Sequence, residues 1–148
     1  MIMAIGECSC KGALPFLKEL VHREFEATMV YLALGDAIVR LDRRDDDDAE
    51  PVLEMLNSGN HMLVDGAFRA VAMLHLTLNQ NAVDRIIQYG SKLMSQDGKR
   101  FWIAAAAAGW NGANVERFLQ ECATSGRDDL ERAASASQKK KYMKWNPL

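Results

Sequence analysis

The sequence predicts an all-helical protein, an α-solenoid of about four helical hairpins, and three observations support this. Helix-forming residues dominate, and only three prolines occur among 148 residues, a length that suits one domain. No long stretch alternates apolar and polar side chains as a half-buried strand would. The same order of helices and turns then recurs along the chain, and such a period is typical of solenoids.

The repeat is clearest in two segments that contain proline. Residues 14–20 (LPFLKEL) resemble residues 50–56 (EPVLEML) at an offset of 36 residues, since 51 − 15 = 36. A helix tolerates proline in its first turn because the missing N–H would have no partner there. Later segments recur at offsets of 37 (93 − 56) and 29 (133 − 104) residues. We therefore expect helix pairs at residues 13–22 with 25–41, 50–57 with 62–76, 82–94 with 99–109, and 114–123 with 128–142.

The second helix of each later pair carries small residues three positions apart near its middle. Small side chains at this spacing allow two helix backbones to approach closely, so we assign them to packing. In the first pair, Tyr31 stands where the next two pairs have alanine. The packing residues are Ala67 with Ala70, Ala104 with Ala107, and Ala133 with Ala136.

A proline-started helix, a turn of Ser, Gly or Asp and an alanine-rich second helix together resemble the HEAT repeat. Residues 115–137 are the best match, and the resemblance covers about residues 13–138. It implies a curved solenoid with a binding face. Residues 1–12 are then an N-terminal extension, 13–142 the HEAT-like repeat domain and 143–148 a C-terminal tail. A helical bundle without repeats is the structural alternative.

Composition and charge favour a cytoplasmic protein. The net charge of −2 and a pI near 5.9 differ from the strongly basic balance of most nucleic-acid-binding domains. The three cysteines, Cys8, Cys10 and Cys122, do not form a disulfide framework. We expect no signal peptide, because no basic segment precedes an apolar one, and no membrane span.

Residues with catalytic or metal-binding chemistry are few. Glu19 and His22 form an E-x-x-H pair, but di-iron bundles need two such motifs and two more glutamates, so we interpret them as a surface pair. Cys8 and Cys10 could ligate a soft metal with His22 or His61, but zinc sites usually use wider spacing and a second pair. We interpret them as free thiols in a loose segment. We expect no enzyme activity, no metal and no cofactor.

Two charged segments are candidate electrostatic patches. The acidic segment is interpreted as a solvated loop or, alternatively, as a patch that steers a basic partner. It consists of Asp45, Asp46, Asp47 and Asp48. The basic segment would contact phosphates or an acidic protein, or would be a solvated helix end against which Trp145 packs back. It consists of Lys139, Lys140, Lys141 and Lys144, with Tyr142 and Trp145 among them.

A candidate partner-binding face follows from aligning the repeats, because the second helices line the inner face of HEAT solenoids. One outward stripe would contain Asp65, Trp102 and Glu131, and an adjacent stripe Arg69, Ala106 and Ser135. Trp102 is either a core residue or an exposed anchor flanked by Arg69 and Arg100, and the second interpretation fits the frequent use of Trp and Arg in interface hot spots.

The HEAT resemblance implies a non-enzymatic protein-binding module that acts as an adaptor, scaffold or inhibitor. An immunity protein that neutralises a toxin is one such inhibitor, suggested by size and analogy alone. The expected partner is another, unidentified protein. One alternative is a nucleic-acid-binding protein similar in architecture to HEAT-like alkylpurine DNA glycosylases. Another is a HEAT protein resembling bilin lyases.

Overall fold

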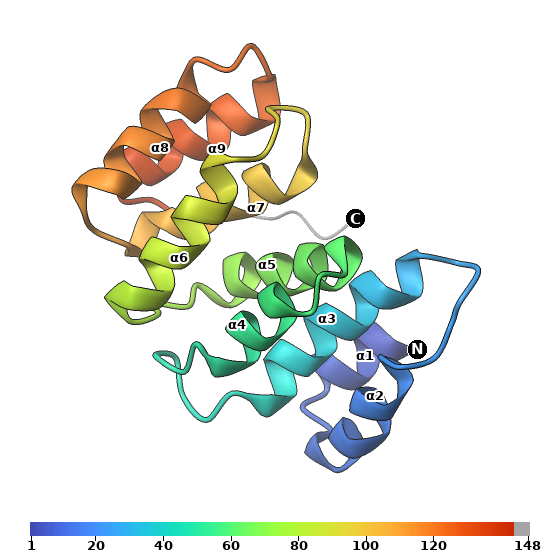
Figure 1. Cartoon of the computed structure of the whole chain (residues 1–148). Helices are drawn as coiled ribbons and strands as arrows, with labels where there is room; N and C mark the ends of the chain where they lie inside the picture. The colour runs from blue at the N-terminus through green and yellow to red at the C-terminus, as the bar shows by residue number, and fades with distance from the viewer. Residues whose placement is uncertain (144–148) are drawn as a thin grey trace. The chain divides into compact units, whose positions relative to one another are not determined.

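The computed structural model describes residues 1–143, and throughout that range the regular structure is helical, which confirms the predicted all-α class (Figure 1). The chain divides into two compact units, Met1–Leu74 (unit 1) and His75–Leu148 (unit 2). Each unit contains two helical hairpins whose second helices pack together, and in unit 2 the first helices also contact each other. A continuous solenoid of four hairpins remains a prediction.

Unit 1 contains the first two predicted hairpins, and the second helix of each forms its centre. α2 packs on α3, α4 packs on α5, and α3 packs extensively on α5. Asn60 begins α5, because its side-chain oxygen accepts hydrogen bonds from the backbone N–H groups of Met62 and Leu63. The elements are α1 (Ile2–Glu7), the 3₁₀ helix η1 (Lys11–Ala13), α2 (Leu14–Leu20), α3 (Met29–Asp42), α4 (Glu50–Asn57) and α5 (His61–Leu74).

Helices α3 and α5 approach each other closely at two glycines. A Cβ atom on Gly66 would lie 2.8 Å from the Leu32 carbonyl carbon and closer still to its oxygen. A Cβ atom on Gly35 would lie 2.9 Å from the Leu63 carbonyl carbon. The two backbones therefore meet without an intervening side chain. The sequence prediction placed the close approach at Ala67 and Ala70, which are buried, but the nearest contact involves their glycine neighbour.

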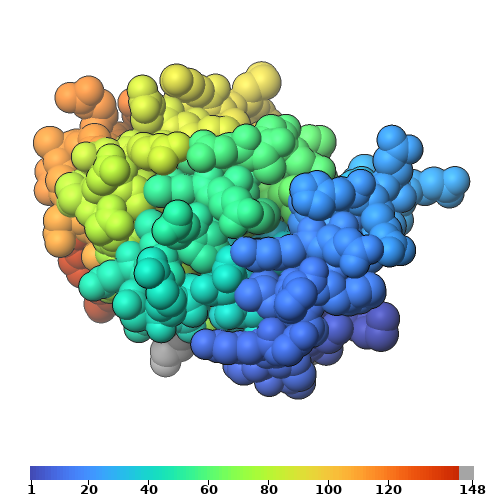
Figure 2. Space-filling model, turned by 60° about the horizontal axis from the view of Figure 1, so that its bottom comes forward, coloured from blue at the N-terminus to red at the C-terminus, as the bar shows by residue number. Residues whose placement is uncertain are grey.

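The loop between α2 and α3 protrudes from unit 1 (Figure 2, blue) and is held at its base by Tyr31. The Tyr31 hydroxyl donates a hydrogen bond to the Arg23 carbonyl at 2.8 Å and accepts one from the Phe25 N–H at 3.2 Å. The Tyr31 and Phe25 rings also form a T-shaped contact. This role explains why the first hairpin has tyrosine where later hairpins have alanine.

The first twelve residues do not form a loose segment. Residues Ile2–Glu7 form α1, which packs on α3. Gly6 is buried there, and a Cβ atom at this position would lie 2.8 Å from the Ala37 Cα atom. The segment that the sequence prediction treated as an extension thus belongs to unit 1.

Unit 2 contains the third and fourth predicted hairpins. α6 packs on α7, α8 packs on α9, and α7 and α9 pack together. The side chains of Asn79 and Asp97 cap α6 and α7. Ala104, Ala107 and Ala133 are buried as predicted. The elements are α6 (Gln80–Ser91), α7 (Gly98–Ala106), the 3₁₀ helix η2 (Ala107–Gly109), α8 (Ala113–Ala123) and α9 (Asp128–Gln138).

The segment after α9 folds back onto unit 2. The Lys140 ammonium donates hydrogen bonds to the Trp110 carbonyl and to the Asn111 side chain. The Tyr142 ring stacks on His75 with 3.8 Å between ring centroids, and burial raises the pKa of its hydroxyl. The prediction that Trp145 packs back, and any role of Lys144, lie outside the described residues.

Candidate functional site

The predicted face residues of unit 1 lie on α5, and one of them is held by internal contacts. Arg69 Nη1 donates a hydrogen bond to Asp36 Oδ2 at 2.6 Å, and Arg40 Nε donates to Asp36 Oδ1 at 2.6 Å. The Asp36 side chain is 0% exposed. The guanidinium of Arg69 therefore neutralises a buried carboxylate. Asp65 is half-buried one turn earlier on the same helix.

Arg100 is buried, whereas the sequence prediction expected it to flank an exposed tryptophan. Its Nη1 donates a hydrogen bond to the Leu93 carbonyl at 2.9 Å, and its guanidinium lies 5.0 Å from the centre of the Phe118 ring. Its Nη2 lies 3.5 Å from the sulfur of Cys122, a buried thiol whose pKa is raised by desolvation. Arg100 thus holds α7 and α8 together, and it is not part of a surface site.

Trp102, which the sequence predicted as either exposed or core, is half-buried on α7, and its ring forms a T-shaped contact with the Phe101 ring, with 5.0 Å between centroids. Ala106, which the sequence prediction placed on the second stripe, is buried and therefore absent from the surface. The two stripe residues of α9, Glu131 and Ser135, are half-buried. Among the residues of the predicted face in unit 2, these two line a groove on the surface.

This groove is open and runs along α9, with one contribution from the end of α8. Five of its side chains follow successive turns of α9 at spacings of three or four residues, so they share one face of the helix. The sequence prediction identified two of the six lining residues, Glu131 and Ser135. The full lining consists of Ala123, Asp128, Glu131, Arg132, Ser135 and Gln138.

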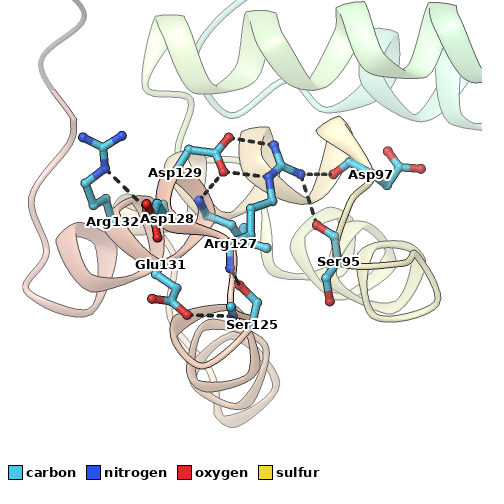
Figure 3. Close-up of polar contacts among 10 residues, drawn as sticks. Ser95, Asp97, Ser125, Arg127, Asp128, Asp129, Glu131 and Arg132 are labelled. Carbon is cyan, nitrogen blue, oxygen red and sulfur yellow. Dashed lines mark hydrogen bonds and ion pairs between the residues drawn. The ribbon is translucent and has the colours of Figure 1, made fainter.

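The groove carries charges of both signs. The Arg132 guanidinium makes no ion pair among residues 1–143, and its Nε donates a long hydrogen bond of 3.4 Å to the Asp128 carbonyl (Figure 3). One oxygen of Glu131 accepts a hydrogen bond from the Gly126 N–H at 2.7 Å. Gln138 donates to the side chain of Gln120 on α8 at 3.3 Å. Two carboxylates, a guanidinium, a hydroxyl and an amide therefore surround one open surface.

Arg127 fixes the position of the groove at the start of α9. Its guanidinium donates two hydrogen bonds to the Asp129 carboxylate, at 2.6 and 2.7 Å. Its Nη1 donates to the carbonyls of Ser95 and Asp97, both at 3.1 Å, in the loop before α7 (Figure 3). The bidentate pair lowers the pKa of Asp129 and raises that of Arg127. The start of α9 is thereby fastened to the neighbouring hairpin.

The predicted acidic patch divides into exposed and structural residues. Asp45, Asp46 and Asp47 are exposed. The Asp48 side chain is only 6% exposed, and it accepts hydrogen bonds from the Arg44 N–H and guanidinium and from the Glu50 N–H. These bonds hold its pKa well below its usual range. Asp48 therefore organises the loop and the start of α4, a role that sequence analysis did not identify.

The remaining candidates show no joint chemistry. Lys139 and Lys141 are exposed, whereas Lys140 bonds to unit 2. Glu19 forms an exposed ion pair with Arg23 and not with His22. Within residues 1–143, no three His, Cys, Asp or Glu side chains come together as metal ligands. None of the helices in this range combines the length and apolarity that a membrane span needs.

Comparison with known proteins adds no family: no family model, curated protein or solved structure matches the chain significantly. The class of protein is therefore described from its fold and its surface alone. The described chain is an all-helical protein of paired helices, with a polar groove on one helix of unit 2.

Proposed function

We propose that the chain is a non-enzymatic protein-binding module and that the groove along α9 is its contact surface in unit 2. One observation carries the proposal: α9 directs five polar side chains into an open groove, away from the buried core of the unit. Arg69, Arg100 and Arg127, by contrast, are engaged inside their own units. The resemblance to HEAT repeats favours an adaptor, scaffold or inhibitor, of which a toxin-neutralising immunity protein is one form.

The fixed position of α9 supports this function. Hydrogen bonds from Arg127 connect the start of the helix to the loop before α7, and the Ser137 hydroxyl bonds to the Ala104 carbonyl at 2.6 Å. A surface that is already ordered loses little conformational entropy when a partner binds. The rigid support therefore leaves more of the contact energy available for affinity.

The charges of the groove indicate the chemistry of the partner. Asp128 and Glu131 would accept hydrogen bonds from lysine or arginine side chains, whereas Arg132 would pair with a carboxylate. Ser135 and Gln138 offer a hydroxyl and an amide to a peptide backbone or a polar side chain. A partner segment with charges of both signs fits this pattern, and mismatched charges would oppose wrong partners.

The groove spans ten residue steps of α9, about 15 Å at 1.5 Å per residue. This length suits a few turns of a partner helix or about five residues of an extended chain. A stable protein interface usually buries at least about 1,200 Å², counted over both partners. The groove would therefore form the polar part of a larger contact.

The test is affinity capture with two matched variants in unit 2. Ser135→Arg fills the groove with a long charged side chain, whereas Gln88→Arg places the same side chain on the exposed face of α6. Both variants should keep the helical circular dichroism of the wild type. A partner retained by the wild type and by Gln88→Arg but lost with Ser135→Arg supports the proposal. Equal retention by all three proteins, with the partner in hand, excludes the groove as the contact surface.

A further inference from the structure

Two exposed thiols lie at the C-terminal end of α1, separated by one residue. Cys8 is the C-cap residue of the helix, and both Cys8 and Cys10 are free and exposed. The helix ends in a Schellman turn, in which the Ser9 N–H bonds to the Gly6 carbonyl and the Cys10 N–H bonds to the Ile5 carbonyl. Ser9 lies between the thiols in the left-handed region, with φ of 55°.

From general chain geometry, we expect this turn to bring the two cysteines into the range of a disulfide. Two Cα–Cα steps of about 3.8 Å each connect Cys8 to Cys10. Because the chain turns between them, the two Cα atoms are closer together than in a fully extended chain. Disulfides span Cα separations of about 4.4–6.8 Å. The Cys10 thiol lies on the Cys8 side of the turn, since its sulfur is 3.9 Å from the Cys8 carbonyl oxygen. The backbone of the turn is held in place because α1 packs on α3 through Gly6.

A metal site does not account for this pair, because no group of three or more potential ligands occurs anywhere in residues 1–143. The third cysteine offers an internal comparison. Cys122 is 0% exposed inside unit 2, where burial raises the pKa of its thiol. Buried thiols react slowly, whereas exposed ones exchange with small disulfides.

We propose that Cys8 and Cys10 form a redox-active dithiol that closes to an intramolecular disulfide by exchange with a small-molecule disulfide such as glutathione disulfide. One protein thiolate attacks a sulfur of glutathione disulfide, forms a mixed disulfide and releases one glutathione. The second protein thiolate then attacks the protein sulfur of that mixed disulfide and releases a second glutathione. The protein pair loses two electrons and two protons, and one glutathione disulfide becomes two glutathione thiols.

The second step is fast because it is intramolecular. The neighbouring thiol is held by the turn at a high effective concentration, which another glutathione molecule in solution cannot match. The mixed disulfide should therefore be short-lived. The product closes a small ring across a left-handed residue, and strained, exposed disulfides of this kind are the readily reduced, regulatory ones.

The test uses the full chain, reduced and then equilibrated across a series of glutathione redox buffers. Remaining thiols are alkylated after acid quenching, and intact and peptide masses are recorded. We expect the peptide with Cys8 and Cys10 to lose two hydrogens and to carry no glutathione. Cys122 should stay reduced in the folded protein and become alkylated only when the alkylating agent acts under denaturing conditions.

Single variants separate closure from simple exposure. Cys8→Ser and Cys10→Ser should each accumulate one stable glutathione adduct under the buffers in which the wild type closes its disulfide. The proposal is overturned if the wild type itself retains one or two glutathione adducts. It is equally overturned if both thiols stay free in fully oxidised glutathione while each single variant forms its adduct.

Discussion

The crossing of α3 and α5 predicts that Gly66→Ala destabilises the protein. The new Cβ atom would lie 2.8 Å from the Leu32 carbonyl carbon and closer still to its oxygen, whereas nonbonded carbon atoms normally stay about 3.5–4.0 Å apart. The obstacle is helix backbone, which cannot rotate away, so the helices must separate by at least about 1 Å. Overpacking of this kind costs about 3 kcal/mol, and alanine recovers about 1 kcal/mol through its helix propensity.

The expected net loss is therefore about 2 kcal/mol in the free energy of unfolding, or roughly 10 °C in Tm if unit 1 unfolds as a domain of its size. Urea denaturation followed by circular dichroism measures it. Gly12→Ala is the matched control, because a Cβ atom there meets nothing within 4 Å, and its effect should stay within about 0.5 kcal/mol. Equal denaturation midpoints for the two variants would refute the proposed backbone contact.

Three further predictions concern single side chains. Asp36→Asn should lower the free energy of unfolding by about 3 kcal/mol, because it removes the charge that the two neighbouring arginines neutralise; equilibrium denaturation measures this. Asp48 has a lowered pKa in the folded state, so its contribution to stability is complete above about pH 5 and declines as the pH falls below about 4. Melting curves of Asp48→Asn should therefore approach those of the wild type at low pH, and a constant difference down to pH 2 would contradict this. Trp102→Ala should lower the free energy of unfolding by about 2 kcal/mol, because this half-buried ring contacts Phe101. An unchanged Tm would show instead that the ring does not stabilise the fold.

Local signals in the sequence were sufficient to predict the eight helices from α2 to α9, but not α1. The helix expected at residues 50–57 coincides with α4 because a proline in the first turn and apolar spacing mark it within a few residues. α1 was missed because six residues are too short for a periodic pattern. Its position depends on Gly6 meeting Ala37, a contact between residues distant in the sequence.

The candidate site was predicted only in part, for related reasons. Repeat spacing placed Glu131 and Ser135 on adjacent stripes of the last helix, and both line the groove; the same spacing of three and four residues would also have identified Asp128 and Arg132. Arg100 was misplaced because charged residues are expected outside. Its burial depends on a carbonyl and an aromatic ring supplied by other elements, which no local pattern reveals.

Hydrogen exchange with a captured partner tests the proposed contact surface most directly. Backbone amides are compared in the free and bound protein, region by region. The proposed function predicts slower exchange in the bound state along α9 (Asp128–Gln138), with α6 (Gln80–Ser91) unchanged. Protection confined to other segments, with α9 exchanging at the same rate free and bound, would contradict a binding surface in the groove.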